Sequence, residues 1–132
     1  MTRRVIIDCD PGVDDALALM LAHGSSELDV TAVTVVGGNQ TLEKVTRNAL
    51  ALTEAIGLDA PVAAGAADPL ERQPQTAGHV HGDTGLGYAE APERHVEHDW
   101  DALWIDSIER GTDDLHLIVT GPMTNLAAFA HT

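Results

Sequence analysis

Basic residues are scarce in this chain of 132 amino acids. It has seven lysines and arginines against 21 aspartates and glutamates, so its formal net charge is −14 at pH 7. Lys44 is the only lysine. Because so much negative charge repels phosphate groups, we expect neither a nucleic acid nor an anionic membrane surface as a partner.

Cysteine and long apolar runs are also rare. Cys9 is the single cysteine, so no disulfide can form within the chain and nothing indicates an oxidising compartment. No apolar run approaches the roughly 18 residues that a bilayer-spanning helix requires. The sequence therefore predicts a soluble cytoplasmic protein, and its length favours a single domain with one modest core.

Four carboxylates within eight positions follow the first apolar run. They belong to Asp8, Asp10, Asp14 and Asp15. Like charges this close repel at a cost of about 1 to 4 kcal/mol per pair, so we expect a cation among them. An all-oxygen donor set without an adjacent histidine or cysteine suits Ca²⁺ or Mg²⁺ better than zinc. Alternatively, Asp14 and Asp15 cap the helix that begins near Val13 and interact with its dipole.

Strand and helix signals alternate along the chain. Apolar and β-branched runs predict strands at residues 5–7, 28–36, 61–64 and 115–119, and helix-forming residues or 3.6-residue periodicity predict helices at 13–23, 41–56 and 100–109. This alternation predicts an α/β fold with an open, mostly parallel sheet flanked by helices. The connection from 65 to 98 lacks clear periodicity, which is typical of a functional loop.

Three polar turns directly follow predicted strands, at residues 8–15, 37–39 and 120–121. The carboxyl ends of parallel strands share one edge of a sheet, and open α/β sheets bind their ligands there. We therefore expect the three turns to meet. The long loop with His79 and His81 is expected to fold over them.

Four segments carry a pattern that is known from one enzyme family. They read DCDPGVDDA at 8–16, VGGNQT at 36–41, HGDTGLG at 81–87 and TGPMTNLA at 120–127. In this order they closely resemble the inosine-uridine preferring nucleoside hydrolases, across essentially the whole chain. The resemblance implies a Rossmann-like sheet and hydrolysis of the N-glycosidic bond of purine or pyrimidine ribonucleosides, which gives ribose and a free base.

The resemblance also implies Ca²⁺ as a cofactor. The ion would be held by the carboxylates of Asp10 and Asp15 and by the backbone carbonyl of Thr120, while Asp10 accepts a proton from the attacking water. This chemistry needs a cation that acidifies water and a carboxylate base beside it. Asp8 is expected to support these ligands rather than to bind the metal directly.

Other matching residues are expected to contact the nucleoside. Asp14 and Asn39 would help to hold the ribose. His81 matches a histidine that lies near the base in pyrimidine-preferring members, where it can assist departure of the base. The pair Thr124-Asn125 either begins the last helix or contacts the substrate.

Members of that family are considerably longer than this chain, and their second half supplies further metal and nucleoside contacts. Residues 1–132 are therefore expected to be the N-terminal part of a single nucleoside hydrolase domain. The resemblance also implies a homo-oligomer, because family members are commonly dimers or tetramers.

Two other functions fit part of the pattern. In a haloacid-dehalogenase-like, Mg²⁺-dependent phosphotransferase, Asp8 would be the nucleophile and Asp10 the acid/base. That family expects Thr or Val where this chain has Gly12, and no downstream lysine matches. The second alternative is a catalytically incomplete, non-enzymatic fragment that retains weak ribose or cation binding.

Overall fold

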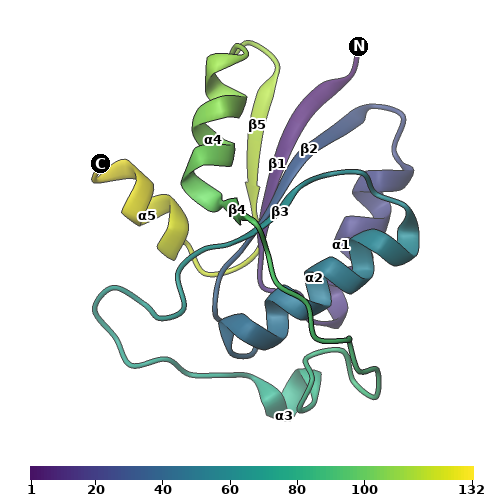
Figure 1. Ribbon diagram of the computed structural model, residues 1–132, viewed down its shortest axis with the longest axis vertical. Helices are drawn as coiled ribbons and strands as arrows, with labels where there is room; N and C mark the ends of the chain where they lie inside the picture. Colours follow the sequence, from purple (N-terminus) through teal and green to yellow (C-terminus); the bar gives the residue numbers. More distant parts are fainter.

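A five-stranded sheet forms the centre of the molecule in the computed structural model, which describes residues 1–132 (Figure 1). Its strands lie in the order β4-β3-β2-β1-β5, and all neighbouring strands are parallel. They are β1 (Arg3–Cys9), β2 (Leu28–Val35), β3 (Val62–Ala64), β4 (His98–Asp99) and β5 (Leu115–Val119). The predicted parallel sheet is confirmed, and the two-residue strand β4 is an addition to it.

Helices cover both faces of the sheet. One face packs against α1 (Val13–Gly24) and α2 (Leu42–Ile56), and the other against α4 (Trp100–Glu109) and α5 (Thr124–Ala130) (Figure 1). The short helix α3 (Gly78–His81) lies within the long connection. None of these helices combines the length and the apolar character that crossing a membrane requires.

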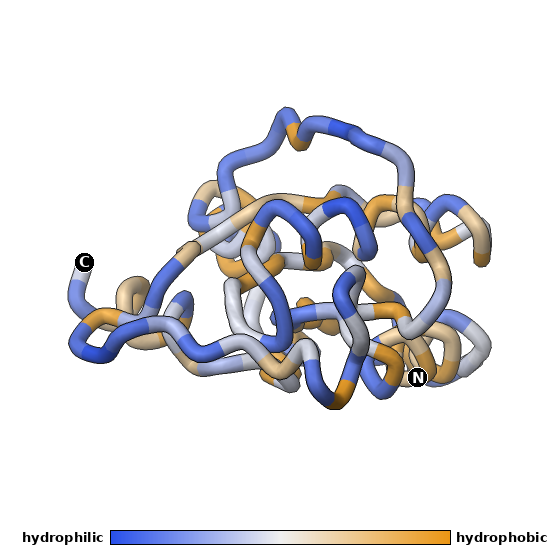
Figure 2. Tube along the Cα trace, turned by 90° about the horizontal axis from the view of Figure 1, so that it is seen from below, coloured by the Kyte–Doolittle hydropathy of each residue, from blue (hydrophilic) through white to orange (hydrophobic).

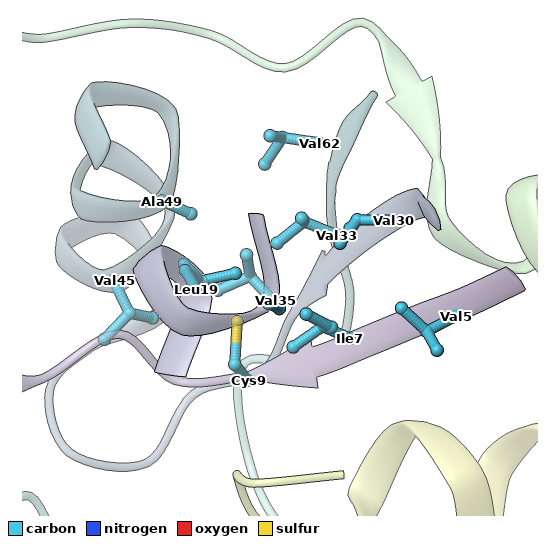
Figure 3. Packing of buried hydrophobic residues seen from close by; sticks show 11 residues of the cluster. Val5, Ile7, Cys9, Leu19, Val30, Val33, Val35, Val45, Ala49 and Val62 are labelled. Carbon is cyan, nitrogen blue, oxygen red and sulfur yellow. The ribbon is translucent and has the colours of Figure 1, made fainter. Parts of the chain in front are cut away.

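Alternation along β1 divides its side chains between two apolar clusters. Val5, Ile7 and Cys9 pack against α1 and α2 (Figure 3). Ile6 points to the opposite face and packs with Trp104 of α4. Burying one Val or Ile side chain contributes about 1.5 to 3 kcal/mol to the stability of the fold. Because β1 is covered on both faces, it fixes the position of the turn that follows it.

The strand order changes direction beside β1. The chain proceeds outward from β1 through β2 and β3 to β4, and then returns to place β5 on the other side of β1. Such a switch point leaves a crevice at the carboxyl ends of the strands, where ligands bind in open α/β sheets. Viewed from this side, the connections around the sheet are largely hydrophilic (Figure 2).

Candidate active site at the carboxyl edge of the sheet

Asp8 lies fully buried near the end of β1 and binds two neighbouring elements. Its Oδ1 accepts hydrogen bonds from Thr34 Oγ1 of β2 at 2.6 Å and from Asn125 Nδ2 of α5 at 2.9 Å. Its Oδ2 has no hydrogen-bond partner. Burial raises the pKa of the Asp8 carboxyl above its usual value, although the two hydrogen bonds oppose that shift. The structure thus places Asp8 beneath the site.

Asp10 and Asp15 adjoin each other in the turn after β1. Asp15 Oδ2 accepts a hydrogen bond from the Asp10 backbone N–H at 3.0 Å, and both carboxylates are buried. Burial, together with the neighbouring Asp15 carboxylate, raises the pKa of Asp10 to about 7. Two buried acidic side chains therefore lie side by side at the end of β1.

Asn39 joins the turn after β2 to the carboxylates. Its backbone N–H donates to Asp10 Oδ2 at 2.7 Å, and its Nδ2 donates to the Asp10 backbone carbonyl at 2.9 Å. The turn after β5 approaches from the other side, because a Cβ on Gly121 would lie only 3.1 Å from Asp10 Oδ1. The Thr120 backbone N–H donates to the Asp8 carbonyl at 2.9 Å. The expected meeting of the three turns is confirmed.

The predicted capping of α1 by an aspartate is wrong. Gly12, which has no side chain, is the N-cap residue, and neither Asp14 nor Asp15 accepts a hydrogen bond from the first N–H groups of the helix. Asp15 instead bonds the Asp10 backbone N–H, because its turn of helix faces back toward the end of β1. Asp14 points outward and is exposed, although it remains at the positive end of the helix dipole.

His81 reaches the carboxylate turn from α3. Its Nδ1 accepts a hydrogen bond from the Val13 backbone N–H at 3.4 Å and lies 3.9 Å from Asp14 Oδ1. The absence of a side chain at Gly12 permits this approach, since a Cβ there would lie 2.6 Å from His81 Nδ1. His79 is exposed on the same short helix. Of the two histidines, the structure brings His81 to the site.

The donor set of the site is made of oxygen atoms that carry unbalanced negative charge. The structure contains no cluster of three or more His, Cys, Asp or Glu side chains that could bind one metal ion. A third ligand beside Asp10 and Asp15 would therefore be another kind of group, such as a backbone carbonyl. None of the ion pairs within the chain includes Asp8, Asp10 or Asp15. These features fit a hard divalent cation.

Sequence reasoning missed part of the support beneath the site. Asn125 is fully buried: its Nδ2 donates to Asp8 Oδ1 and to the Val35 carbonyl, and its Oδ1 accepts from the Ala66 N–H at 2.8 Å. The pair Thr124-Asn125 begins α5, as expected, but Asn125 does not cap this helix, whose N-cap is Met123. The motif at 120–127 identifies Asn125, but no local signal links it to Asp8, which lies 117 residues away.

The comparisons with known proteins agree with this geometry. The sequence pattern of the "Inosine-uridine preferring nucleoside hydrolase" family matches residues 5–132. The chain belongs to this family. A nucleoside hydrolase of that description from Crithidia fasciculata is 43% identical over 98% of the chain. A "Pyrimidine-specific ribonucleoside hydrolase RihA" from Photobacterium profundum is 47% identical over 96% of it. The match favours a hydrolase over the haloacid-dehalogenase-like alternative.

Solved nucleoside hydrolase structures share the fold. A plant nucleoside hydrolase superposes with a TM-score of 0.89 at 36% identity over 99% of the chain, and the purine-preferring ribonucleoside hydrolase from Gardnerella vaginalis gives 0.89 at 35% over 98%. The chain spans 43% of the length of each of these two proteins and a similar share, 43% and 42%, of the two sequence relatives.

The raised pKa of Asp10 predicts how stability depends on pH in metal-free buffer. A carboxyl with a folded pKa of about 7 and an unfolded value of about 3.9 contributes stability below pH 4 that is lost as the pH rises through 7. Asp10→Asn keeps the shape of the side chain and removes that charge. We expect the free energy of unfolding, measured with urea in the presence of EDTA, to fall between pH 4 and pH 8. In wild type this fall should exceed that of the variant by up to roughly 4 kcal/mol. Identical pH profiles would refute this assignment.

Proposed function

We propose that this chain carries the carboxylate-bearing part of a ribonucleoside hydrolase, which cleaves the N-glycosidic bond of purine or pyrimidine ribonucleosides to give ribose and a free base. The observation that carries the proposal is the convergence at Asp10, which bonds both Asn39 and Asp15 at the switch point of the sheet. The names of the relatives, inosine-uridine preferring and pyrimidine-specific, support a ribonucleoside as the substrate.

The proposed cofactor is Ca²⁺, held by the carboxylates of Asp10 and Asp15 and by the backbone carbonyl of Thr120. In support, the donors are all oxygens, the two carboxylates are buried together, and no cationic side chain of the protein pairs with them. When bound, such a cation supplies Lewis acidity, which lowers the pKa of water and orients it for attack.

The side chains at the edge have complementary proposed roles. Asp10 binds the Asn39 N–H through Oδ2, which leaves Oδ1 to accept the proton of the attacking water. Asp14 and Asn39 flank that group and hold the ribose hydroxyls. The nearby carboxylates stabilise the positive charge that develops on the sugar in an oxocarbenium-like transition state. His81, whose Nδ1 lies 3.9 Å from Asp14 Oδ1, protonates the departing base.

Ca²⁺ is expected to stabilise the folded chain. A ligand that binds only the native state adds RT ln(1 + [L]/Kd) to the free energy of unfolding, and thus raises the melting temperature. This term is about 1.4 kcal/mol when the ligand concentration is ten times Kd. Calorimetry with and without Ca²⁺ should show this shift for wild type and for Asp14→Ala, which removes a neighbouring exposed carboxylate. Asp10→Ala should abolish it. An equal shift in Asp10→Ala would contradict the proposed metal site.

Ribose release tests the proposed reaction. The 132-residue chain alone spans less than half of its relatives, and we expect it to release negligible ribose from inosine or uridine. A longer protein that contains these residues should release ribose from one or both nucleosides, and Asp10→Asn should lower turnover about 100-fold or more. A reducing-sugar assay measures both. An inactive longer protein would instead support the non-enzymatic alternative.

His81 is expected to act on the leaving base. In such an active protein, His81→Ala should lower uridine turnover by about 100-fold and inosine turnover by less, since protonation by a positioned group contributes on that scale. His79→Ala removes the exposed histidine of the same helix and serves as the control. Equal losses on both nucleosides would show that His81 has a different role.

A further inference from the structure

Three polar side chains, two on α2 and one just before it, bind consecutive carbonyls of the loop that follows His81. Lys44 and Asn48 are four residues apart and lie on the same side of α2, and Gln40 precedes the N-cap of that helix. In chain order the donors are Gln40, Lys44 and Asn48, and their acceptors are the backbone carbonyls of Gly82, Asp83 and Thr84 at 2.9, 2.5 and 2.8 Å. We call these three side chains the α2 donor row.

This loop has little apolar packing to hold it in place. From 82 to 87, all residues except the buried Gly85 are exposed or half-buried, and Leu86 is the only large apolar side chain among them. The loop turns sharply, with positive φ at Gly82 and Gly85, and its internal hydrogen bonds run from Gly85 N–H to the Gly82 carbonyl and from Gly87 N–H to the His81 carbonyl. Its attachment to the rest of the protein therefore depends strongly on the α2 donor row.

Asn48 also binds the carboxylate turn. Its side chain is only 2% exposed, and the same Nδ2 that donates to the Thr84 carbonyl donates to the Pro11 carbonyl at 3.1 Å. One buried amide thus joins the loop that begins after His81 to the turn that carries Asp10. Because buried polar groups are costly to leave unpaired, this amide favours a single spacing between the two segments.

We propose that the α2 donor row positions His81 against the carboxylate turn, with Asn48 as the residue that couples the two segments. We call them positioning residues, since their side chains bind backbone carbonyls of the loop and act through His81. The catalytic consequence rests on the proposed hydrolase function, whereas the placement of His81 is a property of the folded chain alone.

Hydrogen exchange on the 132-residue chain tests the attachment of the loop. In Lys44→Met and in Asn48→Ala, the Gly85 and Gly87 amides should exchange about fivefold faster than in wild type, as expected for the loss of one hydrogen bond, while β1 amides keep their rates. Thr53→Ala is the matched control, because this buried hydroxyl of α2 donates only to the Leu50 carbonyl of its own helix.

The imidazole resonances of the histidines provide a second measurement. Both variants should shift or broaden the His81 signal and leave that of His23, at the end of α1, unchanged. Unchanged exchange in the loop, equal acceleration in β1, or an unmoved His81 signal would overturn the proposal. If Asn48→Ala does not fold, Lys44→Met decides the question, since its half-buried chain leaves no internal cavity.

These measurements need no substrate. Absence of ribose release would therefore refute the hydrolase function without affecting the exchange result. Conversely, if the variants of the α2 donor row do not change hydrogen exchange in the loop, the positioning role is refuted whatever the activity of the protein.

Discussion

The buried carboxylate of Asp8 is the interaction on which the rest of the site depends. Its side chain binds Thr34 of β2 and Asn125 of α5, and its backbone carbonyl accepts the N–H of Thr120 after β5. Trp104 of α4 adds a donor to Thr34 Oγ1 at 3.2 Å. Removing a donor from a buried carboxylate is costly, so the hydrogen bonds to Asp8 Oδ1 and to its carbonyl fix β2, α5 and the turn after β5 relative to β1.

This arrangement places acidic side chains close together in a protein whose formal net charge is already −14. Asp10 and Asp15 are held together by a backbone hydrogen bond and by their place at the end of β1. Four arginines form ion pairs, and all of their partners are other acidic residues. Lys44, the only lysine, serves the loop and not the carboxylates. No cationic side chain of the protein offsets these carboxylates, so the compensating charge is either a proton, which the raised pKa of Asp10 favours, or a cation from solution.

Local patterns were enough to predict the sheet, its main helices and the meeting of three turns. The strand at Val5 to Ile7 and the helix stop at Gly57, whose φ is 71°, are encoded by neighbouring residues. The supports of Asp8 are not, because Thr34 and Asn125 lie 26 and 117 residues away from it. The sequence pattern does mark Asn48, because it is a polar residue on the apolar side of the predicted helix at 41–56.

The two parts of the site are held by different forces. The carboxylate turn extends from β1, which is buried on both faces, so moving it requires disruption of the core. The loop beside His81 depends on hydrogen bonds, each of which contributes about 1 kcal/mol net. Local opening follows the weakest attachments, so the loop opens far more readily than the sheet. The core thus fixes the carboxylates, whereas His81 adjoins a segment that hydrogen bonds from Lys44 and Asn48 hold to α2.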